Sequence, residues 1–566
     1  MNRRDWRQFR LLSRDAVRQL IDAALYSRES DPMEFAVWML ALIATPPAFF
    51  AAQQIFTYIA LVKAPADVVQ QVATSHRLFF VVYGMLAAAL LAALTWEAVF
   101  PDGRDQEVIG VLPVRPHTFA AARLGAAAIV GVAFTAAINV PAAFVYTLMA
   151  AGHPSLRDPK LLVGHLIATM MASLTVFFAL ISLRGIVAVI LGPRAGVWLG
   201  AALQIVAIIL LVDVFFFLPG VLGAMAGYVL RGEPSTLVYP PVWFGALHLW
   251  IAGVGGPLIG DGAGLGALAF VGTALLTIPI YLLPAKYLGR RALERRSRQH
   301  ATGLALTLRI ISVITRATPS VRAVFAFIVA SLIRSRRHLS IVATYFGLAI
   351  AVCVVSFFVL DGRGTVVLAY PTAWLLALPL VFIYFLVLGL RAAFRIPTEI
   401  EANWPFRVTP PSLATCVNAT ALAMFTLAVL PVGAATFFGS VFMWPIGQAL
   451  GATALQMLAG LMLIECVLAA WTKVPFACGH LPSPDVFKAL WPIYGIALLI
   501  FAFLLSDWQV AALTSVTALG SYLAFCLTVI LTVRTWRWRT RKNQSIPFDV
   551  VAGHAVEQLK LSGALN

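Results

Sequence analysis

The sequence has little charge for its length. Only 11% of its 566 residues are Asp, Glu, Lys or Arg and 61% are hydrophobic, whereas a soluble domain has about a quarter charged and about half apolar residues. Acidic residues are scarcer than basic ones, with 24 Asp and Glu against 41 Lys and Arg. This composition excludes an ordinary soluble domain. Apolar runs of about 20 residues recur along the chain, each long enough to cross ~30 Å of hydrocarbon as a helix.

Several patterns that carry chemistry are also missing. The chain has no Gly-Lys dipeptide, so it has no GxxxxGK[ST] phosphate cradle, and any ATP hydrolysis must come from another chain. HExxH and GxSxG are absent, and the five cysteines include no CxxC pair. The polar, basic N-terminal region lacks the apolar run of a signal peptide. We therefore expect a protein that is not an enzyme and that itself binds no metal or cofactor.

The apolar runs are continuous rather than alternating, which predicts helices and not a barrel. We expect an all-α polytopic membrane protein with about twelve transmembrane helices in two pseudo-repeated six-helix halves. The net charge of +17 comes from basic residues that flank apolar runs, which indicates a lipid bilayer and no nucleic acid. With the N-terminus placed inside, both termini are cytoplasmic and few basic residues lie outside: Lys63, Arg77, Arg157, Lys160, Arg231 and Arg363.

One loop sequence occurs twice, because residues 97–124 align without a gap to residues 391–418. Each copy has an acid-x-acid pair, then Val-x-Pro, then a hydroxyl that opens a new apolar run. Such self-similarity predicts two copies of one unit, although chance in a sequence of low complexity remains an alternative. The matched positions are Asp105, Glu107, Val114 and Pro116 in the first copy and Glu399, Glu401, Val408 and Pro410 in the second.

The spacing of charges and apolar runs predicts the domain organisation. The first half, 1–285, begins with an amphipathic helix at 6–26 and contains the loop 101–118. Its span two begins at about Leu78, its span five covers 197–218, and 219–262 holds two short re-entrant pieces, Val221–Leu230 and Trp243–Val254. A basic linker at 286–338 carries a second amphipathic helix. The second half, 339–533, contains the loop 395–412, ends with spans 489–505 and 509–533, and precedes a tail at 534–566.

Few ionisable residues fall within the predicted spans, and charge inside a membrane indicates function by default. Asp213 and Glu465 are the two candidates. For each, a functional role and a structural role with paired polar groups are equally favoured. We expect His165 to be a hydrogen-bonded packing residue and Arg123 to reach the membrane surface.

The order of elements resembles the permease of an ATP-binding cassette (ABC) exporter, the class that includes drug, polysaccharide and bacteriocin exporters. That class has an amphipathic elbow helix, six spans, a coupling helix between spans two and three, and re-entrant helices between spans five and six. The segment FPDGRDQEVIGVLPVRPHTFAAARL lies at the coupling position. The second half departs, since its copy reads WPFRV and its last outer loop is too short for re-entrant helices.

The resemblance implies an ATP-driven export permease with two fused six-span halves in a bacterial inner membrane. Two separate ABC ATPase subunits per chain would push the coupling segments, and the eight matched residues would form these contacts. Two alternatives remain open. One is a secondary transporter with twelve spans, although paired ion-coupling carboxylates are missing. The other is a polytopic membrane enzyme or assembly factor.

Overall fold

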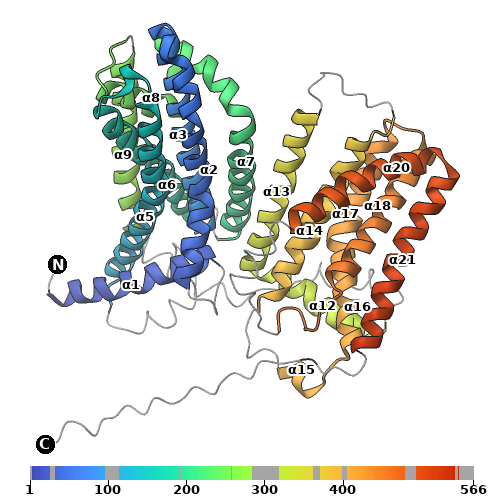
Figure 1. Ribbon diagram of the computed structural model, residues 1–566. Coiled ribbons are helices and arrows are strands. Elements are labelled where there is room, and N and C mark those ends of the chain that lie inside the picture. Colours follow the sequence, from blue (N-terminus) through green and yellow to red (C-terminus); the bar gives the residue numbers. More distant parts are fainter. Residues whose placement is uncertain are drawn as a thin grey trace, which may run out of the picture. The chain divides into compact units, whose positions relative to one another are not determined.

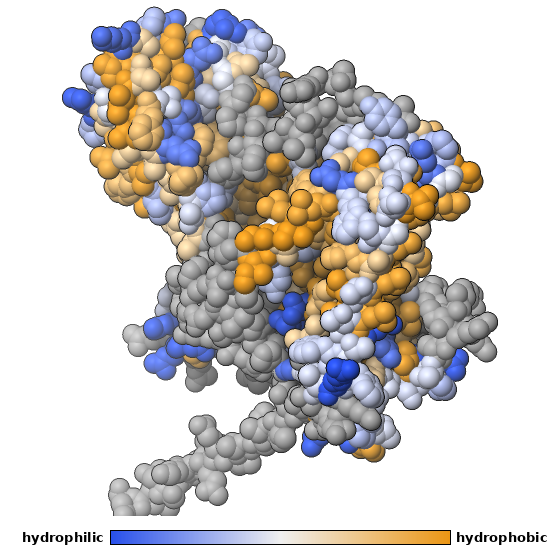
Figure 2. Space-filling view, turned by 45° about the vertical axis from the view of Figure 1, so that its right-hand side comes forward, coloured by the Kyte–Doolittle hydropathy of each residue, from blue (hydrophilic) through white to orange (hydrophobic). Residues whose placement is uncertain are grey.

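The computed structural model describes residues 3–25, 32–95, 114–190, 193–256, 258–282, 318–360, 370–397, 404–477, 493–541 and 546. Helices form almost all of these residues, and no strand occurs among them (Figure 1). Within the described ranges, ten helices are long and apolar enough to cross a membrane. Figure 2 shows hydrophobic residues over much of the helical surface. Large apolar side chains such as Phe438 and Leu531 are 64% and 59% exposed. Surfaces of this kind require lipid and not water around them, so the predicted all-α polytopic membrane fold is confirmed.

The chain divides into two compact units. Unit 1 comprises residues 1–300 and 350–355, and unit 2 comprises residues 301–349 and 356–566. The long helices of unit 1 are α1 (Arg3–Leu25), α2 (Pro32–Ala60), α3 (Ala66–Leu94), α5 (Pro116–Ala150), α6 (Lys160–Ile190), α7 (Pro193–Arg231), α8 (Pro240–Ile251) and α9 (Ile259–Leu282).

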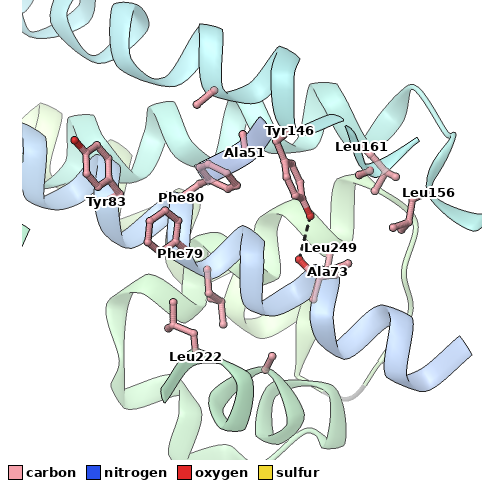
Figure 3. Packing of buried hydrophobic residues seen from close by; sticks show 14 of the residues in the cluster. Ala51, Ala73, Phe79, Phe80, Tyr83, Tyr146, Leu156, Leu161, Leu222 and Leu249 are labelled. Atoms are coloured by element: carbon pink, nitrogen blue, oxygen red, sulfur yellow. Dashed lines mark hydrogen bonds between the residues drawn. The ribbon is translucent and has the colours of Figure 1, made fainter. Parts of the chain in front are cut away.

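Helix α3 is the centre of unit 1. It packs against α5, α6, α7 and α8, and most of its apolar stretch is buried. Phe79, Phe80 and Tyr83 of α3 lie in one buried cluster with Tyr146 of α5 and Leu222 of α7 (Figure 3). Helices in a membrane gain stability from close contact more than from exclusion of water. An alanine-rich core helix that is surrounded by four others meets this requirement.

Two glycines let helices of unit 1 approach closely. A Cβ atom on Gly84 would lie 2.6 Å from Ser173 Oγ, and one on Gly131 would lie 2.5 Å from the ring of Phe177. Both distances are shorter than any stable contact, so a larger residue would separate α3 or α5 from α6. Small residues at helix contacts are the usual solution in membranes.

Two predicted boundaries in unit 1 are wrong. Helix α3 begins at Ala66 and not at Leu78, so Arg77 lies inside this helix and not in a loop. Helix α7 continues to Arg231, so Val221–Leu230 is the end of span five and not a separate re-entrant piece. Pro219 and Gly220 suggested a break, but a proline can remain in a membrane helix when neighbouring groups take up the freed carbonyl. The other short piece is the separate helix α8.

Unit 2 is also built almost entirely from helices in its described part. Its elements are α12 (Pro319–Arg334), α13 (Arg336–Leu360, except residues 350–355, which belong to unit 1), α14 (Ala373–Arg395), α15 (Trp404–Val408), α16 (Leu413–Met424), the π-helical turn η6 (Phe425–Val429), α17 (Leu430–Val441), α18 (Ile446–Val467), the π-helical turn η7 (Leu499–Leu504), α20 (Leu505–Thr514) and α21 (Val516–Arg541). Helices α16 and α17 run on through η6. This π turn ends just before Pro431, whose missing N–H prevents regular helical pairing.

The last two predicted spans have the wrong boundary. Residues 493–514 are continuously helical, and the break comes at Ser515, whose backbone is extended. Ser506 and Asp507 suggested a loop, but both lie within the helix. Gln509 is a further polar residue within this helix, and it is hydrogen-bonded: its Nε2 donates to Tyr522 Oη of α21 at 2.8 Å. Pairing between adjacent helices makes the polar residues compatible with a span.

Several packing partners recur in the two units, although the packing of α2 on α5 has no counterpart of similar extent between α13 and α16 or α17. In unit 1, α1 packs on α5, α3 packs on α6 and α7, and α6 packs on α9. In unit 2, α12 packs on α16, α14 packs on α18 and α20, and α18 packs on α21. The described part of unit 2 contains no counterpart of α8. These recurring partners support two copies of one helical unit, as the repeated loop sequence predicts.

Candidate functional site

The first copy of the repeated loop, 101–118, which we call the first coupling segment after its expected role, leads into α5, and the second copy, 395–412, is likewise called the second coupling segment. Asp105 and Glu107 lie outside the described residues. Val114 is half-buried, and Pro116 is exposed at the first position of α5. A proline suits this position because its fixed φ angle matches the helix and its missing N–H would have had no helical partner. The Val-x-Pro pattern therefore sets the point at which α5, the fourth long helix of unit 1, begins.

The second coupling segment has the same relation to α16. Glu399 and Glu401 lie outside the described residues. Val408 ends the short helix α15 and is 72% exposed, and Pro410 is also exposed. Ser412 then caps α16, because its Oγ accepts the amide hydrogen of Thr415 at 3.2 Å. An exposed apolar side chain thus precedes a firmly capped helix.

Of the amphipathic helix predicted at 6–26, residues 6–20 have described side chains, and these follow the expected pattern. Arg10, Arg14 and Arg18 are exposed, whereas Ala16 and Leu20 are buried in a cluster with residues of α5 and α6. The alternation follows from the four-residue repeat of arginines, which places them on one side of the helix. The apolar side of α1 is therefore fixed on the bundle of unit 1.

Arg123, which we expect to reach the membrane surface, is buried against α1 near the start of α5. It is 5% exposed, and its Nη2 donates to Gln19 Oε1 of α1 at 2.8 Å. Its guanidinium also lies 5.3 Å from the centre of the Phe119 ring, within range of a cation–π contact. Arg123 therefore joins α1 to the first turns of α5, immediately after the first coupling segment.

Helix α12 plays the corresponding part in unit 2. Thr318 caps the start of α12, and Phe325 and Ile328 lie on the buried face of this helix. Helix α12 packs on α16. Phe327 adds a contact with the coupling segment itself, since its ring lies 4.9 Å from that of Phe406 on α15, edge to face. The amphipathic helix, α15 and α16 are thus linked at one end of the unit.

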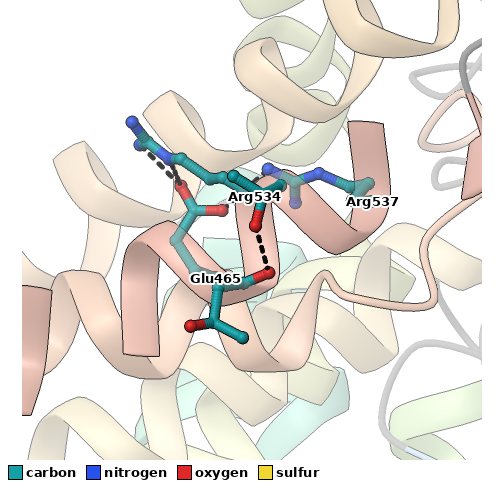
Figure 4. Close-up of polar contacts among 5 residues, drawn as sticks. Glu465, Arg534 and Arg537 are labelled. Carbon is teal, nitrogen blue, oxygen red and sulfur yellow. Dashed lines mark hydrogen bonds and ion pairs between the residues drawn. The ribbon is translucent and has the colours of Figure 1, made fainter. Parts of the chain in front are cut away.

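Glu465 is held by two arginines of α21. The carboxylate is nearly fully buried, with one oxygen 2.6 Å from Arg534 Nη2 and the other 2.8 Å from Arg537 Nη2 (Figure 4). Arg537 is mostly buried, whereas Arg534 is half-exposed. Buried charge persists where it is paired in this way. Of the two roles considered for Glu465, the geometry therefore favours the structural one, a bridge that fixes α18 to α21.

Asp213 is not brought into any such arrangement. Its side chain on α7 is half-buried, and its Oδ1 is buried without a hydrogen-bond partner. No ion pair of Asp213 occurs in the described part of the chain. Its two predicted roles therefore stay open.

His165 lies in a buried aromatic cluster of unit 1. Its ring is 5.1 Å from those of Phe80 and Tyr146 and 5.5 Å from that of His248. Tyr146 hydrogen-bonds to Tyr58 at 2.9 Å and donates to the carbonyl oxygen of Ala73 at 3.2 Å. The expected packing role is met by the ring contacts, but the expected hydrogen bond is missing at Nδ1, which has no partner.

Two residues of this region were given no role from the sequence. Arg77 was assigned to a loop because the uninterrupted apolar run begins only at Leu78. The helical spacing of the buried residues Val69, Ala73 and Phe80 is the signal that places Arg77 within α3. His248 lies on α8 and is almost completely buried, and no local sequence pattern pairs it with His165.

No family model, curated protein or solved structure matches this chain. Among the residues that the structure describes, no group of three His, Cys, Asp or Glu side chains could hold a metal ion.

Proposed function

We propose that this chain is the permease subunit of an ABC-type exporter, with one copy working with two separate ATPase subunits. It would lie in a bacterial inner membrane with both termini in the cytoplasm. One observation carries the proposal: each unit fixes an amphipathic helix on the helix that follows its coupling segment, α1 on α5 and α12 on α16. The same construction recurs in both units. It fits a pair of equivalent positions, which we call drive points, at which the two ATPase subunits would push on the permease.

The amphipathic pattern of α1 supports a membrane-surface location for the first coupling segment. A helix with exposed arginines on one side and apolar residues on the other lies at the boundary between lipid and water. With Arg10, Arg14 and Arg18 exposed on one side, α1 would lie at that boundary. Because Arg123 joins α1 to the start of α5, the first coupling segment would lie there too.

Movement of a coupling segment would be transmitted along the helix that follows it. Pro116 begins α5 and Ser412 caps α16, so each helix starts within a few residues of its Val-x-Pro pattern. Helix α5 then packs on α2, α3 and α6, and α16 packs on α18. A push at the membrane surface would therefore shift the packing of each bundle, which is the rigid-body action that alternating access requires.

Exposed groups on unit 2 provide a surface for an ATPase. Val408 is 72% exposed, and its neighbours Arg407 and Pro410 are exposed as well. An apolar side chain with a polar rim is typical of a protein contact. The acids Asp105, Glu107, Glu399 and Glu401 would add charge complementarity, which sets register and specificity more than affinity. Their alternative role is to stabilise the first turn of a short helix.

The test is purification of the tagged chain from its native membranes in mild detergent. We expect a second chain that carries GxxxxGK[ST] to co-purify, with ATP hydrolysis in the complex. Val408→Asp should reduce ATPase retention at least tenfold while the permease stays folded. The control is Val238→Asp, because Val238 is 76% exposed but lies between α7 and α8.

The four acids are tested singly by Lys substitution. If the acid contacts the ATPase, its Lys variant should no longer retain the ATPase. If the acid only stabilises a helix end, its Lys variant should unfold at a lower temperature but still assemble with the ATPase. Retention of the ATPase by Val408→Asp and by all four Lys variants would refute the proposed drive points. Absence of any ATPase from the wild-type preparation would refute the transporter class.

A further inference from the structure

Unit 1 contains a buried cation that has no anionic partner. Arg77 on α3 is 2% exposed, and its Nε and Nη1 atoms are buried without a hydrogen-bond partner. Among the described residues, no carboxylate forms an ion pair with it. A guanidinium inside a membrane protein is costly unless it is paired or serves a ligand pathway. This arginine therefore lacks the partner that its burial requires.

Three more unpartnered polar atoms lie around Arg77 on three helices. Thr74 Oγ1 is on α3, His165 Nδ1 on α6 and His248 Nε2 on α8, and all three atoms are buried. Their residues are at most 2% exposed. Thr74 precedes Arg77 by three positions, so both lie on one face of α3. Such groups are nearly always satisfied in a native protein, and four together indicate a missing partner.

Close helix contacts bring these residues together. Leu78, which follows Arg77, lies against Gly245 on α8, three positions before His248. The ring of His165 lies 5.5 Å from that of His248 and 5.1 Å from that of Phe80, which follows Arg77 by three positions on α3. Burial and the charge of Arg77 both lower the pKa of His248, so its ring is neutral at pH 7 and has one N–H to donate.

The chemistry of this cluster selects an anion. The charge of Arg77 opposes a metal cation between the two histidines. A guanidinium binds the planar fork of a carboxylate or phosphate through parallel hydrogen bonds, and hydroxyl and ring N–H groups can donate to the remaining oxygens. Arginine, threonine and neutral histidine are all donors for such a group.

We propose that Arg77, Thr74, His165 and His248 form a binding site for an oxyanion, the phosphate or carboxylate group of a lipid or of a free solute. Arg77 supplies the charge, and the other three supply single hydrogen bonds. Because His248 comes from α8, which has no counterpart in the described part of unit 2, the site belongs to unit 1 alone. This assignment extends beyond the proposed transport function and does not depend on it.

The experiment uses the full chain in detergent after removal of bound lipid. Binding of inorganic phosphate and of acetate is measured by thermal shift and by isothermal titration. A second arm places the protein in nanodiscs of phosphatidylglycerol or phosphatidylcholine and counts retained lipids by native mass spectrometry. The variants are Arg77→Met, Arg77→Lys and His248→Phe. The control is Arg157→Gln, which removes the same charge from an exposed site.

We expect Arg77→Met to bind at least one of these anions about ten- to a hundredfold more weakly than wild type, since hydrogen bonds to a charged group are lost. Arg77→Lys should retain part of the affinity for the same anion. His248→Phe should bind that anion several-fold more weakly than wild type, and Arg157→Gln should bind it as tightly as wild type. If Arg77→Met loses phosphate or acetate binding, the natural ligand of the site is a free solute. If Arg77→Met loses retained phosphatidylglycerol, the natural ligand is a lipid.

Two results would overturn the site. One is a wild-type protein that binds neither the two solutes nor phosphatidylglycerol in preference to phosphatidylcholine. The other is equal binding by wild type and Arg77→Met. If Arg77→Met does not fold, unchanged binding by His248→Phe overturns it instead. Neither result bears on ATPase association, so the two proposals fail separately.

Discussion

Replacing Glu465 by Gln should destabilise unit 2 by about 3 kcal/mol, because removal of one member of a buried ion pair leaves the other without compensation. The substitution keeps the shape of the side chain and removes only its charge. Arg537 is the partner that matters, since it is 13% exposed and its Nη1 is already buried without a partner. Arg534 is 52% exposed, so water compensates it and its loss should cost at most about 1 kcal/mol.

A double-mutant cycle isolates the interaction between the two buried charges. Glu465→Gln, Arg537→Met and the double variant are unfolded in mixed micelles with increasing SDS, and tryptophan fluorescence is followed. We expect a coupling energy of about 1–3 kcal/mol between Glu465 and Arg537, whereas Arg534→Gln serves as the exposed control. A Glu465→Gln protein as stable as wild type, together with a coupling energy near zero, would refute a structural bridge between α18 and α21.

Two further predictions concern packing and topology. Gly84→Ala should destabilise the protein by about 1–3 kcal/mol in the same assay, because the new Cβ would lie 2.6 Å from Ser173 Oγ; Gly264→Ala, which meets nothing within 4 Å, should be neutral or stabilising, and equal effects would contradict the packing argument. In a cysteine-free background, an impermeant maleimide added to intact cells should label Ser235→Cys and not Thr409→Cys, both exposed positions; the opposite pattern would invert the topology.

Features that depend on local periodicity were predictable. The amphipathic helices α1 and α12 were located from the spacing of their basic and apolar residues, because one helical face gathers every third or fourth residue. The starts of α5 and α16 were predictable for a similar reason. Pro116 and Ser412 are local signals for the first turn of a helix.

Boundaries set by tertiary packing were not predictable. Arg77 was placed in a loop because its charge interrupts the apolar run, yet α3 extends past it, surrounded by other helices. Ser506 and Asp507 suggested a turn, but the chain turns only at Ser515. In each case the polar residue lies within a helix that packs on other helices, and a single-sequence window contains no information on those neighbours.

The candidate site was predictable only in part. Glu465 was recognised as unusual from its position in an apolar run, but Arg534 and Arg537 were assigned to an interfacial tail. Their pairing joins residues far apart in the sequence, and no spacing rule connects them. The cluster around Arg77 shows the same difficulty, since α3, α6 and α8 each contribute residues that have no local pattern in common.

The composition of the intact complex tests the central claim most directly. Native mass spectrometry of the tagged chain, purified from its own membranes, should show one copy with two copies of a chain that carries GxxxxGK[ST]. This stoichiometry follows from two equivalent drive points, one on each unit of a single chain. A chain that appears alone, or two copies of it with two ATPase subunits, would contradict the account of a fused permease with paired coupling segments.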